Sequence, residues 1–385
     1  MPTPTIHGTC DPRFARVRDL FAEHFANPDE LGACVAVTLE GRPVVDLWAG
    51  HADAERQRAW QQDTIVNLFS TTKGMAAICA HRLADQGKLD LDAPVARYWP
   101  EFAQADKGAI PVRWLLDHSA GLAAVIDPLP PTALYEWDMM AQALAAQAPL
   151  WEPGREHGYH AITFGFLVGE VVRRVAGTSV GRYFRDEIAG PLGADLSIGT
   201  SAECDARTAD LVMEGPKPGE PNMFAEIIAK AKPYALKAFM NPIPNGGFNS
   251  RGWRAAEIPA ANGTGNARAL ARIYGALACE GTLDGVGLLS PAAIDRARTQ
   301  QRSGPDNVIP ILDTKFGLGF QIGTTDEPIG PNPRAFGHSG MGGSFGFADP
   351  EARIGFGYAM NRMESGLFLI GPRATALMNA TFASL

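Results

Sequence analysis

Residues 64–73 read TIVNLFSTTK, and this stretch decides how the rest of the chain is interpreted. Its first six residues are apolar and extended in character, whereas residues 74–86 favour a helix that ends at Gly87, a natural C-cap. If the helix opens at Ser70, the serine hydroxyl lies at the positive end of the helix dipole, beside backbone N–H groups without an intrahelical partner. Lys73 lies almost one turn later, so the two side chains share a face. The stretch therefore predicts a serine nucleophile with a candidate base beside it.

The same pattern has a structural interpretation, because a serine can cap a helix and the lysine can lie on its surface. No other serine in the chain has a lysine three residues later. A rival serine lies in residues 177–181, GTSVG, which fit the G-x-S-x-G pattern of a nucleophile elbow. That elbow needs a preceding strand, but residues 164–176 have a helical pattern. We therefore expect Gly177 to end one helix and Ser179 to cap the next.

The composition is that of a soluble globular protein, with 46% hydrophobic and 20% charged residues in a chain of 385. This length suffices for two domains or for one large domain with an insertion. The net charge of −8 and the lack of a basic run disfavour a nucleic-acid partner. No run of about 18 apolar residues indicates a membrane partner, and no signal peptide is recognised. The five cysteines are scattered, so we expect reduced thiols and a cytoplasmic location.

Motifs for metals and cofactors are weak or missing. His157 and His160 have an H-x-x-H spacing, but no carboxylate pattern of a zinc hydrolase accompanies them. Neither a dinucleotide fingerprint nor a phosphate-binding loop occurs. We therefore expect no metal, no cofactor and a small-molecule partner, and the sequence leaves the oligomeric state open.

Hydrophobic periodicity predicts strands near both ends of the chain and helices between them. The predicted helices cover residues 12–27, 70–86, 111–116, 134–148, 162–175, 180–188, 268–279 and 367–382, with one more after Ser290. The predicted strands cover residues 33–39, 43–49, 317–322, 333–338, 344–349 and 353–360. Residues 201–262 are rich in Pro, Gly and Asn and are left unassigned.

This order favours an α+β fold in which one antiparallel sheet is built from both chain ends and flanked by helices. We expect residues 1–95 and 290–385 to form the sheet domain. Residues 96–289 form an inserted, mainly helical domain, and the active site lies between the two. Some apolar residues of the unassigned segment are either core or the lining of a substrate entrance: Met223, Phe224, Ile227, Ile228, Phe239 and Met240.

Tyr159 lies in a turn-rich loop, residues 151–161, just ahead of a predicted helix. One interpretation is a core aromatic residue whose hydroxyl is satisfied. The other is a phenol held against a lysine, which acts as acid and base and whose charged form the cation favours.

Four segments, in this order along the chain, resemble the serine β-lactamase and penicillin-binding-protein superfamily. They are residues 70–73 (STTK), residues 115–122 (LLDHSAGL), the loop that carries Tyr159, and residues 337–343 (GHSGMGG). From about Gly32 to the C-terminus, the chain is most similar to the class C β-lactamase-like esterases known as family VIII carboxylesterases. The resemblance implies a β-lactamase-like fold and a serine hydrolase.

Carried onto this sequence, the resemblance implies a role for each residue of the catalytic centre. Ser70 is the acylated nucleophile, and Lys73 and Tyr159 share the proton transfers. The backbone N–H groups of Ser70 and Met341 form the oxyanion hole.

The expected substrate-binding residues are His338, Ser339, Gly340 and Trp151. The first three stand where the family has a Lys-Thr-Gly motif, whose lysine would bind the carboxylate of a β-lactam or a peptide. Imidazole is mostly neutral at pH 7, so this attraction is weakened. Two residues after the tyrosine, Ala161 replaces the usual Asn or Ser, whose side chain would grip a lactam. Both departures favour uncharged esters over β-lactams.

We therefore expect a carboxylesterase that hydrolyses small, uncharged, short-acyl esters through a Ser70 acyl-enzyme. The sequence leaves the general base open between Lys73 and Tyr159, because a lysine at its ordinary pKa of about 10.4 is a poor base at neutral pH. The alternatives are a β-lactamase or D-amino-acid peptidase, an acyltransferase that uses the same acyl-enzyme, and a non-catalytic binding protein on this scaffold.

Overall fold

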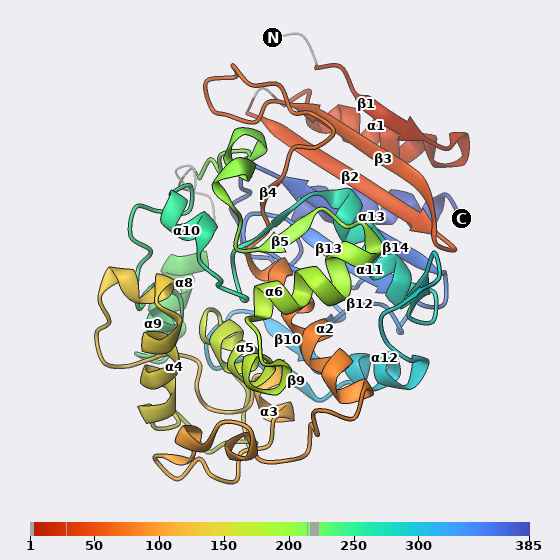
Figure 1. The fold of residues 1–385 in the computed structure, drawn as a ribbon. Helices are drawn as coiled ribbons and strands as arrows, with labels where there is room; N and C mark the ends of the chain where they lie inside the picture. The colour runs from red at the N-terminus through yellow and green to blue at the C-terminus, as the bar shows by residue number, and fades with distance from the viewer. Residues whose placement is uncertain (1–3, 28, 214, 216–222) are drawn as a thin grey trace.

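The computed structural model describes residues 4–27, 29–213, 215 and 223–385, and these residues form a large antiparallel sheet with helices on both faces (Figure 1). The strand order is β1-β3-β2-β14-β13-β12-β11-β10-β9, so strands from both chain ends lie side by side. In this order the strands are His7–Cys10, Arg42–Gly50, Gly32–Leu39, Ile354–Met360, Phe345–Asp349, Phe336–Ser339, Gln321–Ile322, Asp313–Phe316 and Arg302–Pro305. The predicted α+β fold with a sheet built from both chain ends is confirmed.

The helices cover the two faces of this sheet and fill the insertion between its halves (Figure 1). Their bounds are α1 Ala15–His24, α2 Thr72–Asp85, α3 Arg113–Leu116, α4 Trp137–Ala146, α5 Thr163–Ala176, α6 Val180–Phe184, α7 Gly190–Leu192, α8 Met223–Lys230, α9 Ala235–Met240, α10 Arg251–Ala255, α11 Ala267–Ala278, α12 Pro291–Arg298 and α13 Pro372–Ala383. The short strands β4 Val66–Asn67, β6 Gly263–Gly265 and β5 Leu196–Ile198 form a second sheet, and β7 Thr282–Leu283 pairs with β8 Val286–Gly287.

The two halves of the large sheet meet where β2 pairs with β14, with Val35 opposite Tyr358. β2 is buried along nearly its whole length because its side chains alternate between two hydrophobic clusters. Val35 and Val37 join the cluster that contains α1 and α13, whereas Cys34 and Ala36 join the cluster that contains α2 and α11. A continuous apolar run is what a strand covered on both faces requires.

α11 lies directly against the sheet because glycines in the neighbouring strand leave room for its backbone. A Cβ atom at Gly355 would lie 2.2 Å from the backbone nitrogen of Gly275. A Cβ atom at Gly357 would lie 2.2 Å from the carbonyl oxygen of Ala267. Since both neighbours are backbone atoms of the helix, this approach is open only to glycine.

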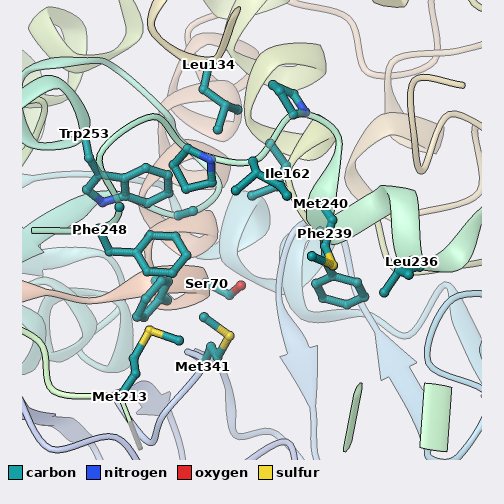
Figure 2. A pocket seen from close by; sticks show the side chains of 17 residues that line it. Ser70, Leu134, Ile162, Met213, Leu236, Phe239, Met240, Phe248, Trp253 and Met341 are labelled. Carbon is teal, nitrogen blue, oxygen red and sulfur yellow. The ribbon is translucent and has the colours of Figure 1, made fainter. Parts of the chain in front are cut away.

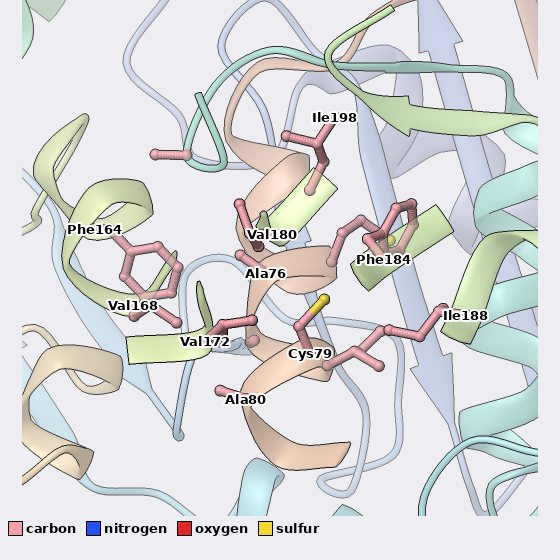
Figure 3. Packing of buried hydrophobic residues seen from close by; sticks show 14 of the residues in the cluster. Ala76, Cys79, Ala80, Phe164, Val168, Val172, Val180, Phe184, Ile188 and Ile198 are labelled. Atoms are coloured by element: carbon pink, nitrogen blue, oxygen red, sulfur yellow. The ribbon is translucent and has the colours of Figure 1, made fainter. Parts of the chain in front are cut away.

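α2 is the buried axis of the helical part. All side chains of α2 that precede Arg82 are buried, as its apolar composition predicts. In Figure 3, Ala76 and Cys79 lie between Phe164 of α5 and Phe184 of α6. The residues that follow the predicted nucleophile are therefore fixed from several sides.

Some predicted boundaries are wrong for identifiable reasons. The C-terminal helix begins at Pro372 and not at residue 367, because proline suits the first turn of a helix. The strand predicted over residues 317–322 is reduced to β11, because Gly319 adopts a φ of 85° and turns the chain. In the large sheet, β1, β9 and β10 were not predicted, since none of them shows a clear alternation of apolar residues over its length.

The unassigned segment 201–262 contains α8, α9 and α10. α11 falls within the predicted helical domain of residues 96–289, yet it packs against β2, β13 and β14 of the sheet. The division of the chain into two domains stays a prediction.

The close approach of α11 gives a test of the fold. We expect Gly355→Ala to lower the free energy of unfolding by about 3 kcal/mol or more, because the added Cβ meets helix backbone that cannot move aside. In Gly287→Ala the added Cβ meets nothing within 4 Å, so this control should change stability by less than about 0.5 kcal/mol. Denaturant unfolding followed by circular dichroism measures both variants. Equal stability of the two would show that the packing is looser than described.

Candidate active site

Ser70 lies in a 3₁₀ turn, Phe69–Thr71, directly before α2, which begins at Thr72. Phe69 has a φ of 42°, a left-handed conformation that is strained for an aromatic residue. Its ring packs edge to face against Phe248, with 5.0 Å between the ring centroids. This turn presents Ser70 to a cavity while α2 anchors it from behind.

Lys73 reaches Ser70 from inside the protein. Its Nζ lies 3.0 Å from Ser70 Oγ and donates hydrogen bonds to the carbonyl oxygens of Ala161, at 2.7 Å, and Ala260, at 3.0 Å. The side chain is fully buried. Burial lowers the pKa of the Lys73 amine well below 10.5, because it disfavours the charged form. The structure thus brings the predicted nucleophile and a candidate base together.

Tyr159 completes this group, because its hydroxyl hydrogen-bonds to Ser70. The centroid of its ring lies 4.7 Å from Lys73 Nζ. Burial raises the pKa of the Tyr159 phenol above 10, and the hydrogen bond to Ser70 opposes this only in part. This direction is opposite to the one expected if the neighbouring lysine stabilised a phenolate, because burial of the phenol itself dominates its pKa.

Three consecutive backbone N–H groups hold the loop at Tyr159. The N–H of Gly158 donates to the carbonyl oxygen of His118 at 3.1 Å, and the N–H of His160 donates to Nδ1 of His118 at 3.1 Å. Between them, the N–H of Tyr159 donates to Oδ1 of the buried Asp306 at 2.9 Å. The motif around His118 therefore positions the tyrosine, which explains why it accompanies Tyr159 in the chain.

The glycine-rich segment after β12 closes against the turn that carries the nucleophile. Oγ of Ser344 donates to the carbonyl oxygen of Leu68 at 2.7 Å. A Cβ atom at Gly340 would lie 2.3 Å from both of these oxygens, so only glycine fits here. Met341 follows and lines the same cavity as Ser70. The use of the Ser70 and Met341 N–H groups as an oxyanion hole stays a prediction.

His338 lies on β12 and is only 1% exposed. Its Nδ1 donates to the carbonyl oxygen of Ser339 at 2.7 Å, and its Nε2 has no hydrogen-bond partner among the described residues. Burial, together with the nearby Lys73, lowers the pKa of His338 to about 3. The imidazole is therefore neutral at pH 7 and does not supply the positive charge of the lysine that it replaces.

The other predicted substrate-binding residues are engaged in the protein framework. The N–H and hydroxyl of Ser339 both donate to the side-chain oxygen of Gln321. Nε1 of Trp151 donates to a backbone carbonyl of its own loop. None of the four predicted substrate-binding residues lines the cavity at Ser70, and their role stays a prediction.

A cavity of about 650 Å³ opens at Ser70 (Figure 2). In Figure 2, Trp253 and Phe248 lie on one side of the serine, and Phe239 and Met240 lie on the other. Much of the wall comes from the unassigned segment 201–262. Sequence reasoning missed most of this wall, because its residues come from two short helices, α9 and α10, and the loops around them, which the sequence left unassigned.

The residues of that segment that were candidates for a substrate entrance lie in different places in the structure. Phe239 and Met240 line the cavity. Ile227 is buried and belongs to the cluster that contains Tyr159. The side chains of Met223, Phe224 and Ile228 lie outside the described residues.

The ring nitrogens of the H-x-x-H pair are used within the protein. Nε2 of His157 lies 2.9 Å from Thr314 Oγ1. In His160, Nδ1 donates to the carbonyl oxygen of Gly158, and Nε2 accepts the N–H of Leu122. Within the described part of the chain, no group of three or more His, Cys, Asp or Glu residues is placed to hold a metal ion. The described helices are also too short or too polar for any of them to cross a membrane.

Comparisons with known proteins agree with this geometry. Residues 17–379 match the Beta-lactamase family. The chain is 37% identical over 382 residues to "Esterase/beta-lactamase LipL" of Mycobacterium tuberculosis, covering 94% of this chain and 85% of the relative. A novel penicillin-binding protein homologue from Caulobacter crescentus has a similar structure, with a TM-score of 0.91 and 43% identity over 99% of this chain and 100% of that one. A family VIII carboxylesterase is similar too, with a TM-score of 0.90, 43% identity and the same coverage.

The sequence match spans nearly the whole chain, and the two similar structures share its complete fold. The segments from which the resemblance was inferred are the ones that meet around Ser70. The chain therefore belongs to the Beta-lactamase family and is a serine hydrolase.

Proposed function

We propose that this protein is a carboxylesterase that hydrolyses small, uncharged esters through an acyl-enzyme on Ser70. The observation that carries the proposal is the environment of Lys73, a buried amine at 3.0 Å from the serine oxygen. The family VIII carboxylesterase of similar structure supports the reaction class.

Lys73 is the general base in this proposal. A neutral amine has two N–H donors and one lone pair. The carbonyl oxygens of Ala161 and Ala260 take both donors, so the lone pair is left for the hydroxyl proton of Ser70. A protonated amine would donate its third hydrogen to Ser70 Oγ, but it would have no counter-charge, and burial disfavours it.

The reaction is a double displacement. Lys73 takes the proton of Ser70 while Oγ attacks the ester carbonyl, and the backbone N–H groups of Ser70 and Met341 stabilise the oxyanion. Tyr159, protonated at neutral pH, gives its proton to the departing alkoxide and regains one from Lys73. Water then attacks the acyl-enzyme and loses a proton to Lys73; as the bond from Ser70 Oγ to the acyl carbon breaks, Oγ takes this proton back, which releases the acid and restores the free enzyme.

The preference for an uncharged substrate follows from the charges of the site. His338 is neutral and buried, and no charged side chain of the described residues lines the cavity.

β-Lactamase or D-amino-acid peptidase activity is the second candidate, because the relative from Mycobacterium tuberculosis carries both names, esterase and β-lactamase. Acyl transfer would use the same acyl-enzyme, and an added acceptor alcohol would reveal it as a new ester. A cytoplasmic location and a small-molecule ester as partner belong to the same proposal.

The role of Ser70 is tested against a matched serine. Ser70→Ala should reduce hydrolysis of a nitrophenyl ester by about a thousandfold or more, because no nucleophile remains. Ser179, in the rival motif, caps α6 by accepting the N–H of Arg182. Ser179→Ala should therefore keep the activity and lose about 1 kcal/mol of stability. Substantial hydrolysis by the Ser70 variant would refute the assignment.

The state of Lys73 is tested by the pH dependence of kcat/KM. The neutral amine is the active form, so kcat/KM should rise with pH through a pKa well below 10.5 and stay high above it. Lys73→Arg keeps a permanent charge and should lose about 10²–10⁴-fold in kcat/KM. An acid limb at the ordinary lysine pKa would contradict a neutral base.

The preference for esters over β-lactams is tested by comparing kcat/KM for one substrate of each class. A chromogenic cephalosporin carries a carboxylate, and the site offers it a neutral His338. We expect its kcat/KM to be at least about tenfold to a hundredfold lower than that of an uncharged nitrophenyl ester, the loss that one missing charged hydrogen bond causes. Comparable values for the two substrates would favour the β-lactamase or peptidase alternative.

A further inference from the structure

The cavity at Ser70 has two kinds of wall. On one side, the rings of Phe69, Phe248 and Trp253 pack edge to face in sequence, with centroids 5.0 Å and 4.8 Å apart. Nε1 of Trp253 donates to the buried Asn67 at 2.9 Å, which fixes the last ring. This wall is rigid because each ring is held by the next.

Another part of the lining, here called the exposed wall, consists of flexible apolar side chains that remain exposed. Met213, Met240 and Ile243 are 52%, 45% and 56% exposed, and all three line the cavity. They make up three of the five large hydrophobic residues that are exposed in the described part of the chain. Such a concentration at the mouth of one cavity indicates a surface that a ligand covers. Methionine adapts its shape to varied apolar ligands.

The volume is larger than a short acyl group needs. About 650 Å³ lies within the range of about 300–1,000 Å³ that is typical of cavities for drug-sized ligands. Apart from Ser70, every described side chain that lines it is apolar. A carboxylate placed here would lose its hydration without gaining a partner.

The arrangement around Ser70 also indicates which half of the ester lies here. The alcohol half must leave beside the hydroxyl of Tyr159, its proton donor, and Tyr159 does not line the cavity. Met341, the expected oxyanion donor, does line it. An acyl chain that leads away from the carbonyl carbon on Ser70 would enter directly.

We infer that the cavity binds the acyl half of the substrate and that this half is a large, uncharged, apolar group, well beyond butyryl in size. The inference rests on the proposed function, since it assigns the substrate class of the same Ser70 site. It keeps the Ser70 esterase reaction of the proposed function but replaces its small, short-acyl substrate with esters of medium-length or bulky apolar acyl groups.

Two ester series separate the acyl and alcohol halves. In the first, nitrophenyl esters carry straight acyl chains from acetyl to dodecanoyl. We expect kcat/KM to rise by at least about tenfold from acetyl to octanoyl, because each buried methylene adds favourable transfer free energy. In the second, acetate esters carry alcohols from ethanol to octanol, and kcat/KM should stay flat. A maximum at acetyl or butyryl, or a rise only with the alcohol, would overturn the inference.

A matched pair of variants tests the exposed wall. Met240→Glu places a carboxylate beside the acyl chain and should reduce the octanoyl-to-acetyl ratio of kcat/KM by at least about tenfold. Leu385→Glu is the control, because Leu385 is exposed to the same degree, 46% against 45%, at the C-terminus on the other side of the molecule (Figure 1). Its ratio should equal that of the wild type. Ile243→Glu repeats the test on the same wall, and thermal unfolding verifies that each variant is folded. Equal ratios in the wall variants and the control would refute the assignment.

Failure of this inference is distinguishable from failure of the proposed function. If Ser70→Ala still hydrolyses the acetyl ester, the proposed function fails. If hydrolysis depends on Ser70 but declines with acyl length, only the assignment of the cavity fails.

Discussion

The candidate active site is built around a buried amine that has no counter-charge among the described residues. The amine of Lys73 is buried against two carbonyl oxygens and a hydroxyl, and its pKa falls because of burial. Removing an unpaired charge from water costs several kcal/mol, so such a group gives up its proton instead. The surrounding fold maintains this state. α2 is buried from its start to His81, and the loop before α5 and the segment before β6 supply the two oxygens.

The same burial removes charge from the other titratable groups nearby. His118, His160 and His338 all have pKa values below the ordinary value for histidine, chiefly because of burial. A site of neutral side chains cannot stabilise a developing oxyanion with a fixed cation. That stabilisation then falls to backbone dipoles, which need rigid placement to act. The bonds that His118 and Asp306 make to the Tyr159 loop, and the fit of Gly340 against Leu68, supply such rigidity.

Much of this arrangement could be predicted from the sequence. The apolar runs of β2 and β14 and the largely apolar sequence of α2 indicate burial, so the centre of the sheet and the buried helix were predicted correctly. The grouping of Ser70, Lys73 and Tyr159 could be inferred from motifs. The turn at Phe69 and the large cavity could not, because both depend on contacts between distant segments. Phe248 and Trp253 lie in the segment that the sequence left unassigned, and only the folded structure brings them to Ser70.

The two halves of the large sheet can pair only late in the synthesis of the chain. β2 ends at Leu39 and its partner β14 begins at Ile354, so almost the entire polypeptide must be synthesised before the two can pair. At about 5–20 residues per second, the ribosome leaves the apolar edge of the N-terminal hairpin unpaired for tens of seconds. An open edge of this kind invites pairing with other chains. The yield of folded protein in a cell therefore depends on how well nascent chains are shielded, independently of how stable the finished molecule is.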